Sequence, residues 1–344
     1  MTRISVHLLG NTAALIGVTF MMLSLNAQAE MSKITFPTAD GTHLNARIYD
    51  PAKNPKAAPA FLLVEGSGKS HFDEELESSS FFQLAKSLSD HGFIVMTFSK
   101  RGSASNAKNG SWAKATFWND NSDVQSAFDF LKSRSGVDPK QMFLFGQSIG
   151  CLHATLLAQK NEIKGLVLFA GGHQNFMQIL EEQNLEILNL TGKSQTEAKK
   201  EIEPMMKALI DLKSGIFKCE NHAPLCSVED GANIVDGTQE KYLVELLKIQ
   251  PLDELAKVKS PTLVLQGSSD FIIDPSEFAR AQKRLQLTHN FSFQLLKNVD
   301  HLMSDRADKK ASLQAMMEMK KTKTFAPLSE KIPSAMMSWM GTSK

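Results

Sequence analysis

QMFLFGQSIGC, at residues 141–151, is the most informative stretch of this 344-residue chain. Residues 142–145 form a short apolar run rich in aromatic side chains, which is typical of a buried strand. The run leads into Gly-x-Ser-x-Gly, and apolar residues then continue at helical spacing. A sharp turn from strand to helix strains the backbone, and Gly146 and Gly150 lack the Cβ atoms that would collide there. We therefore predict that Ser148 stands exposed at the carboxyl end of a strand, beside the start of a helix.

Apolar runs and helical patterns alternate on both sides of this stretch. Further buried strands are predicted at 60–64, 93–98, 163–170, 261–267 and 291–296, and helices at 81–90, 124–131 and 276–285. Ahead of them, two strand-like segments flank the Asp40-Gly41 dipeptide, which predicts a hairpin. Continuous apolar runs of this kind are typical of parallel strands covered on both faces. The chain is therefore predicted to have an α/β fold, with a mostly parallel central sheet flanked by helices.

The pattern changes between residues 173 and 259. Helical periodicity is evident at 176–190 and 205–212, and we identify no clear core strand in this segment. An insertion of this size between two strands predicts a helical cap over the carboxyl edge of the sheet. The predicted domains are a core formed by 30–172 together with 260–344, and a helical cap insertion at 173–259.

The N-terminus has the pattern of a signal peptide. Arg3 precedes a largely apolar run at 13–25, and Ala27-Gln28-Ala29 follows as an Ala-x-Ala cleavage site. The run is too short and too weakly flanked for a good transmembrane helix. We expect residues 1–29 to be removed after Ala29, which implies a periplasmic or secreted protein with no stable membrane insertion. The alternatives are a retained membrane anchor or a translation start at Met31.

The charge balance excludes one class of partner. Lys and Arg number 38 and Asp and Glu number 37, so the chain has no global field that would attract nucleic acid. No block of like charge resembles a nucleic-acid-binding arm. With 42% hydrophobic and 22% charged residues, the composition is that of a globular protein with a sizeable core.

The three cysteines do not form a convincing metal site. Cys219 and Cys226 bracket a short loop, and in an oxidising compartment they are candidates for a disulfide. Together with His222 they form only an incomplete zinc set, so we expect no metal. Cys151 follows Ser148 on the predicted helix and is expected to be a small buried hydrophobic residue rather than a reactive thiol.

A glycine-rich turn, EGSGKS at 65–70, follows the strand predicted at 60–64. It resembles a phosphate-binding loop but lacks the first glycine of that pattern, since Leu63 occupies the position. Acidic residues at 73–75 would also repel a nucleotide phosphate. We therefore reject a nucleotide site. The backbone N–H groups of such a turn can instead point at an anionic oxygen.

A serine hydroxyl is a poor nucleophile until a base takes its proton, so Ser148 requires a histidine and a carboxylate. Asp270 comes just after the strand predicted at 261–267, and His301 comes just after the strand at 291–296. Singly, the serine motif fits an ordinary turn, Asp270 a loop cap and His301 a surface histidine. Together they follow the order serine, acid, histidine at one sheet edge, which predicts a catalytic set of all three.

Two other carboxylates are alternatives for the acid, and three other histidines lie near the proposed site in the sequence. Asp274 precedes Pro275 at a predicted helix start and is better interpreted as a helix cap. Asp300 is adjacent to His301, so its side chain is expected to point elsewhere. His153 is expected to be packed on the helix after Ser148, whereas His71 and His173 are candidates to line a substrate cleft.

From about residue 60 to His301, the chain resembles the α/β-hydrolase superfamily, and more narrowly the bacterial exported hydrolases related to serine aminopeptidases. The motifs that carry this resemblance are Gly66-Ser67-Gly68, Lys100-Arg101-Gly102, the 146–150 stretch, Asp270 and Asp300-His301. The chain departs from the family in three places: Glu65 stands where many relatives have His, Ser103-Ala104-Ser105 replaces a glycine-containing segment, and Ile149 and Cys151 are bulkier than usual. These departures leave the fold intact and bear on the substrate.

The resemblance implies a two-step acyl transfer without a metal or organic cofactor. His301 would deprotonate Ser148, and Asp270 would hold the imidazole and stabilise its charged form. The oxyanion would be bound by the backbone N–H groups of Ile149 and, by analogy with the family, Ser67.

The leading hypothesis is an exported serine hydrolase, specifically a carboxylesterase acting on a small-molecule acyl ester. One alternative is a serine aminopeptidase-like peptidase, for which Glu181, Glu182 and Glu186 are available to hold a substrate amino group. Another is a non-catalytic binding protein on a hydrolase scaffold. Nothing in the sequence indicates an oligomeric state.

Overall fold

The computed structural model describes residues 30–52, 56–69, 79–103 and 109–342. The predicted signal peptide with its cleavage site, and the cleft candidate His71, lie outside the described residues. Among the described helices, none is both long enough and apolar enough to cross a membrane.

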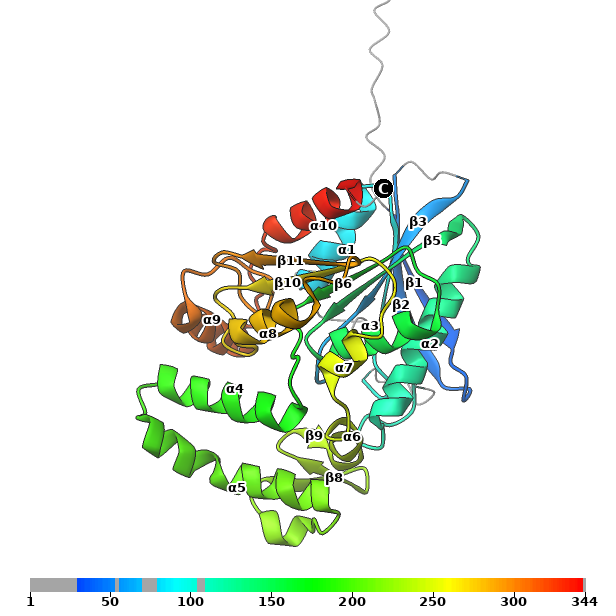
Figure 1. The fold of residues 1–344 in the computed structure, drawn as a ribbon. Coiled ribbons are helices and arrows are strands. Elements are labelled where there is room, and N and C mark those ends of the chain that lie inside the picture. The colour runs from blue at the N-terminus through cyan, green and yellow to red at the C-terminus, as the bar shows by residue number, and fades with distance from the viewer. Residues whose placement is uncertain (1–29, 53–55, 70–78, 104–108, 343–344) are drawn as a thin grey trace, which may run out of the picture.

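An eight-stranded sheet forms the centre of the molecule, in the order β1-β2-β4-β3-β5-β6-β10-β11 (Figure 1). Its strands are β1 (Glu30–Pro37), β2 (His43–Asp50), β3 (Ala58–Val64), β4 (Ile94–Phe98), β5 (Val137–Gln147), β6 (Gly165–Phe169), β10 (Thr262–Gly267) and β11 (Phe291–Leu296). The hairpin strand β2 pairs antiparallel with both β1 and β4, and all the other pairs are parallel. The predicted α/β architecture with a mostly parallel sheet is confirmed.

Helices cover both faces of this sheet. They are α1 (Ser80–Asp90), α2 (Phe117–Ser133), α3 (Ile149–Lys160), α8 (Pro275–Leu285) and α10 (Lys331–Thr342). Helix α9 (Lys309–Thr322) instead packs beside α4 (Phe176–Leu190) of the insertion. Alternation along β3 explains the two layers, because successive side chains of a strand point to opposite faces. Leu62 lies in the hydrophobic cluster formed with α2, α3 and α8, whereas Phe61 and Leu63 lie in the cluster formed with α1 and α10.

Helix α2 begins earlier than the sequence pattern predicted, at Phe117 rather than 124. Thr116 caps it: the Thr116 hydroxyl accepts the Asn119 N–H at 3.1 Å, and the Asn119 side chain accepts the Thr116 N–H at 3.1 Å. This reciprocal arrangement satisfies two N–H groups that the first turn otherwise leaves without partners. Residues 117–123, which lie ahead of the helix predicted at 124–131, therefore form the first turns of α2.

The insertion between β6 and β10 contains helices and a small sheet. Its elements are α4 (Phe176–Leu190), α5 (Gln195–Ser214), a 3₁₀ turn (Cys219–His222), β7 (Cys226–Glu229), β8 (Ala232–Val235), β9 (Thr238–Gln239), α6 (Glu240–Leu246) and α7 (Pro251–Leu255). Figure 1 shows α4 and α5 side by side, next to β8, β9 and α6. The three short strands are antiparallel and were not predicted. Leu255 of α7 already packs in the core cluster.

Cys219 and Cys226 are joined by a disulfide, which ties the 3₁₀ turn to β7. His222, the third member of the incomplete zinc set, is hydrogen-bonded through Nε2 to Asp211 at 2.9 Å. Within the part of the chain that the structure describes, no three His, Cys, Asp or Glu side chains gather where they could hold a metal ion. Cys151 is buried in α3 as a free thiol.

Candidate active site

Ser148 lies at the sharp turn between β5 and α3. Its backbone has φ 56° and ψ −124°, a conformation that non-glycine residues adopt only when the surroundings hold them in it. The surroundings here are tight: a Cβ on Gly146 would lie 2.5 Å from the Gly150 carbonyl oxygen, and one on Gly150 would lie 2.2 Å from that of Val64. The turn is also held by the Ser148 N–H, which donates to the Phe169 carbonyl at 3.0 Å. Both glycines are therefore sterically required, as predicted.

Asp270 and His301 lie in contact at the carboxyl ends of β10 and β11. His301 Nδ1 is 2.9 Å from Asp270 Oδ2, and the Asp270 side chain is completely buried. The carboxylate accepts three more hydrogen bonds, from Gln266 Nε2 at 3.0 Å and from the N–H groups of Ile272 and Ile273 at 2.8 and 2.9 Å. Four donors thus fix the orientation of the carboxylate, and through it the orientation of the imidazole.

Ser148 and His301 line the same cleft, which has a volume of about 520 Å³. Gln147, the residue before Ser148, donates from Nε2 to the His301 carbonyl oxygen at 2.9 Å and ties the two loops together. Within the described residues, the Ser148 hydroxyl makes no hydrogen bond to the His301 ring in this structure. Hydrogen bonds of this kind are often long in enzymes without substrate and tighten when substrate binds. The structure thus joins Asp270 to His301 and places Ser148 at the same cleft.

The two competing carboxylates face other partners. Asp274 caps α8 by accepting the Ser276 N–H at 2.8 Å, as predicted, and also pairs with Lys309 at 2.5 Å. Asp300 accepts the Ser304 N–H at 2.9 Å, whereas the His301 ring is paired with Asp270.

Two other histidines near the proposed site in the sequence, His153 and His173, are buried and do not line the cleft. His153 stacks on Phe117 with ring centroids 4.4 Å apart, and its Nε2 lies 3.1 Å from the Tyr242 hydroxyl. Burial lowers the pKa of His153 to about 3 and that of His173 to about 4, so both are neutral near pH 7. His153 is packed as predicted. His173 does not line the cleft, because its segment is held to Glu277 through the His173 N–H at 2.7 Å.

The glycine-rich loop after β3 lies against the serine turn. A Cβ on Gly66 would be 2.9 Å from the Ser148 Cβ, so only glycine fits where the two segments meet. Gly66, Ser67 and Ile149 line the cleft together with Ser148. Ile149 is the first residue of α3, so its N–H has no partner within the helix. The two backbone N–H groups predicted to bind an oxyanion therefore belong to residues that line the same cleft as Ser148.

The remaining cleft wall combines apolar and polar side chains. Helix α4 contributes Phe176, Ile179, Leu180, Gln183 and Asn184, which recur at helical spacing and therefore lie on one face. The other wall residues are Leu152, Gly172, Asp236, Thr238, Leu246, Pro251, Ile272, Ile273, Leu302, Met316 and Lys320, with Glu65 at the loop. A cleft of this composition can hold a ligand that carries both an apolar part and polar groups.

Two site residues were missed from the sequence, Gln147 and Gln266. Each is buried near the end of an apolar strand, and each donates to a residue of the candidate set. Their signal is a polar amide inside an apolar run, because a buried amide needs a hydrogen-bond partner. The sequence alone did not show which partner each amide would have.

Comparison with known proteins agrees with this architecture. A family model described as "Serine aminopeptidase, S33" matches residues 75–305, which is more than half of the chain. The esterase EstD of Thermotoga maritima is 22% identical over 260 residues, which cover 75% of this chain and 58% of that esterase.

Two solved structures illustrate the shared fold. Est1E from Butyrivibrio proteoclasticus has a TM-score of 0.53 at 15% identity and covers 84% of this chain and 98% of its own. The α/β hydrolase GrgF from Penicillium sp. sh18 has a TM-score of 0.57 at 13% identity and covers 91% of this chain and 99% of its own. At these identities the likeness concerns the fold. From the match to the family model, the chain belongs to the serine aminopeptidase S33 family of α/β-hydrolases.

Proposed function

We propose that this hydrolase cleaves an acyl ester through Ser148, His301 and Asp270, with an acyl-enzyme intermediate. The observation that carries the proposal is the 2.9 Å contact between His301 Nδ1 and Asp270 Oδ2, at the cleft that Ser148 also lines. Because Nδ1–H donates to the carboxylate, the other ring nitrogen, Nε2, is the one that can accept a proton. The positive φ of Ser148 supports the same assignment, since strained residues concentrate at functional sites.

The chemistry follows from these positions. His301 Nε2 takes the proton of the Ser148 hydroxyl as Oγ attacks the ester carbonyl, and Asp270 stabilises the resulting imidazolium. The tetrahedral oxyanion accepts hydrogen bonds from the N–H groups of Ile149 and Ser67, each worth about 3 kcal/mol in the transition state. His301 then gives the proton to the leaving alkoxide, and the alcohol departs. Water, deprotonated by the same imidazole, hydrolyses the acyl-enzyme and releases the acid.

The proposed substrate class is an ester with an apolar acyl group, because α4 presents Phe176, Ile179 and Leu180 to the cleft. The three glutamates considered for binding a peptide amino group are on α4, but the residues of α4 that line the cleft are others. Glu182 instead pairs with Arg280 at 3.2 Å and Glu186 with Lys309 at 2.9 Å, so two of the three are engaged with cations of the core.

The peptidase alternative rests on a different residue, Asp236. It lines the cleft from the small sheet of the insertion and is exposed, so its carboxylate is accessible to a substrate amino group. Assay of p-nitrophenyl esters of two to twelve carbons against aminoacyl p-nitroanilides separates the two functions. We expect turnover of the esters; turnover of the anilides alone would replace the esterase proposal with an aminopeptidase.

We also propose that the protein is exported to the periplasm or secreted. The support is the signal-like pattern of residues 1–29 and the Cys219–Cys226 disulfide, since disulfides persist in oxidising compartments. N-terminal sequencing of the mature protein from a bacterial host should begin at Glu30. A protein that retains Met1 and stays in the cytosolic fraction would contradict export.

Covalent labelling tests the central proposal. A fluorophosphonate probe should label the folded protein at Ser148, and Ser148→Ala should neither label nor turn over ester. Ser126→Ala is the matched control, because Ser126 lies on α2 outside the cleft. Its hydroxyl donates to the Ser122 carbonyl at 3.0 Å and accepts the Ala39 N–H at 3.2 Å. Peptide mass mapping identifies the labelled serine. If the folded wild type does not label, the protein is a binding protein on a hydrolase scaffold rather than a serine esterase.

A further inference from the structure

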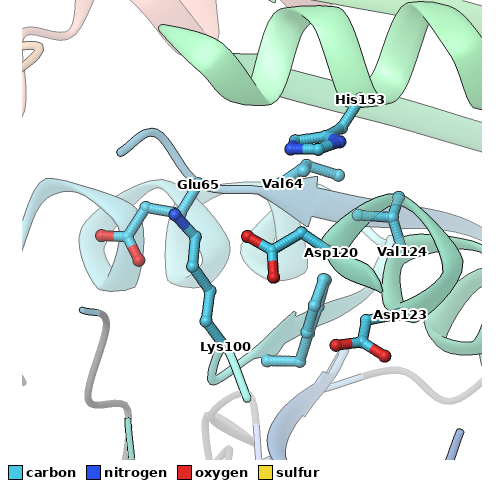
Figure 2. Close-up of a pocket in the computed structure, with 8 residues that line it drawn as sticks. Val64, Glu65, Lys100, Asp120, Asp123, Val124 and His153 are labelled. Carbon is cyan, nitrogen blue, oxygen red and sulfur yellow. The ribbon is translucent and has the colours of Figure 1, made fainter. Parts of the chain in front are cut away.

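Lys100 contacts the loop that carries Ser67 and lines a small cavity separate from the cleft. Its Nζ donates to the Gly66 carbonyl oxygen and, at 3.2 Å, to the Gly68 carbonyl oxygen. One ammonium therefore binds the carbonyls on both sides of Ser67. Figure 2 shows the Lys100 side chain running toward Glu65, along a small cavity that Asp120 and His153 also line.

The direction of the Gly66 carbonyl sets the direction of the Ser67 N–H. Both groups belong to the same peptide unit, and in a trans peptide they point to opposite sides. With its oxygen held by Lys100 on the cavity side, this peptide turns its N–H away from Lys100. Gly66 and Ser67 line the cleft with Ser148, so the N–H is turned to the side where an oxyanion would form.

The loop needs such a restraint because of its composition. Glycine gives the backbone more conformational freedom than any other residue, and Gly68 adopts φ +95°, which other residues rarely do. No side chain of Gly66 or Gly68 can hold the loop by packing. An external donor that binds two of its carbonyls removes much of this freedom.

Lys100 is itself rigidly supported. It follows β4, and the Ser99 N–H donates to the Asn45 carbonyl at 2.8 Å. On the other side, Arg101 makes two hydrogen bonds to the buried Asp123 carboxylate, at 2.8 and 2.6 Å. The backbone that carries the ammonium is thus fixed at both neighbouring residues.

A buried carboxylate balances the charge of Lys100. Asp120, in the first turn of α2, lines the same cavity. Burial raises the pKa of Asp120 to about 6, and Lys100 acts in the opposite direction. Near pH 7 Asp120 is therefore mostly ionised. It attracts the Lys100 ammonium, while the Lys100 hydrogen bonds to the Gly66 and Gly68 carbonyls remain in place.

We propose that Lys100 is a positioning residue of the oxyanion hole, which orients the Ser67 N–H by binding the Gly66 and Gly68 carbonyl oxygens. This inference rests on the proposed esterase function. Lys100 does not touch the substrate; its effect passes through one peptide group.

Replacement of Lys100 tests the role. Lys100→Met keeps an unbranched apolar chain but removes the donor, and we expect kcat to fall about 10- to 100-fold with KM changed less than about 3-fold. Loss of a whole oxyanion donor costs about 100- to 1,000-fold, and a misdirected donor should cost part of that. Inhibition by a trifluoromethyl ketone, whose adduct carries an oxyanion, should weaken by a similar factor. Lys100→Arg, which retains donors, should recover part of the activity.

Lys69→Met is the matched control. Lys69 is in the same loop, but its Nζ pairs with Glu229 at 2.6 Å and lies over the Trp112 ring. Its loss should change kcat less than about 3-fold, which separates an effect of carbonyl contacts from a general effect of positive charge. If Lys100→Met does not fold, Lys100→Gln, a neutral donor with a shorter reach, should show the same fall in kcat at unchanged KM.

The outcomes separate the two proposals. A wild type that fails to label at Ser148 overturns the esterase function. If the wild type labels and hydrolyses ester, but the folded Lys100 variants keep the wild-type kcat or change only KM, the positioning role alone is wrong.

Discussion

The core and the insertion each contain a histidine paired with an aspartate at the same distance. In the core, His301 Nδ1 is 2.9 Å from Asp270 Oδ2; in the insertion, His222 Nε2 is 2.9 Å from Asp211 Oδ2. Both imidazoles are largely buried. Measured only by this contact, the two pairs are equivalent.

Their surroundings are not equivalent. Four donors hold the Asp270 carboxylate within the core, whereas Asp211 is partly exposed and shares its charge with Lys207 at 2.8 Å on the same helix. His301 lines the cleft with Ser148, whereas His222 stacks on Phe217 with ring centroids 4.8 Å apart. A histidine–carboxylate contact therefore does not define an active site. The proposed site differs by the cleft that His301 shares with Ser148, the proposed nucleophile, and by its fixed carboxylate.

Replacing each aspartate of the two pairs by asparagine should give the largest difference between the two regions, measured as kcat. In Asp270→Asn the amide can no longer hold the imidazole in the required tautomer, and we expect kcat to fall about 10,000-fold. Asp211→Asn should leave kcat within about 3-fold, because its histidine does not reach the cleft. Steady-state ester hydrolysis by the two purified variants measures both effects. Similar losses in the two variants would remove the distinction between a catalytic and a structural pair.

The core was more predictable from sequence than the insertion. Apolar runs long enough to be buried on both faces identified the main strands, and parallel strands bring their carboxyl ends to one edge. Asp270 and His301 follow two such strands, so their common edge could be inferred before their contact was known. The contact itself depends on loop conformations, and the sequence pattern does not specify these.

The small sheet of the insertion has a signal in the sequence, which is a pair of Asp-Gly dipeptides. Asp230-Gly231 and Asp236-Gly237 are the turns on either side of β8, and all four residues have positive φ. Asp-Gly is favoured in tight hairpins because both positions require that conformation. The strands were not evident because they are very short and partly exposed, with little apolar alternation.

The cleft face of α4 could not be predicted. Its apolar pattern indicated a helix, but which face meets the cleft depends on how the insertion packs against the core. The three glutamates of α4 were therefore available from the sequence as candidates to bind a substrate amino group. Two of them form ion pairs with residues of α8 and α9 instead, which become neighbours only in the folded chain.

The carboxylates of the two regions should respond to pH in opposite ways. Burial raises the pKa of Asp120 to about 6 in the core, so between pH 4 and 6 the folded state retains a proton that the unfolded state has released. Stability from this group is therefore lost as pH rises through that range. Asp120→Asn removes the effect and should raise the free energy of unfolding at pH 7 by up to about 3 kcal/mol, with little difference at pH 4.

Asp230 of the insertion is the control, because its contribution to stability should change with pH in the opposite direction. The Ser111 and Lys114 side chains lower its pKa, so its contribution is present above the ordinary pKa of an aspartate and is lost as pH falls. Urea unfolding at several pH values measures the free energy of unfolding of Asp120→Asn and of Asp230→Asn. A stability gain for Asp120→Asn that is equal at pH 4 and pH 7 would contradict the ionisation of Asp120 as its cause.

Removal of the disulfide should have the smallest effect on stability, and the effect should be confined to the insertion. Cys219 and Cys226 are separated by 7 positions, and closing so short a loop contributes about 2 kcal/mol in the chain-entropy description. The insertion has its own cluster of buried residues, including Ile202, Leu209 and Leu243. In the Cys219→Ser/Cys226→Ser double variant we therefore expect amides of α5 and β8 to exchange hydrogen faster, while those of β5 and β10 keep their protection. If all four elements lose protection together, the insertion and the core unfold as one cooperative unit, and the two His–Asp pairs belong to a single structural unit rather than to two that can be altered separately.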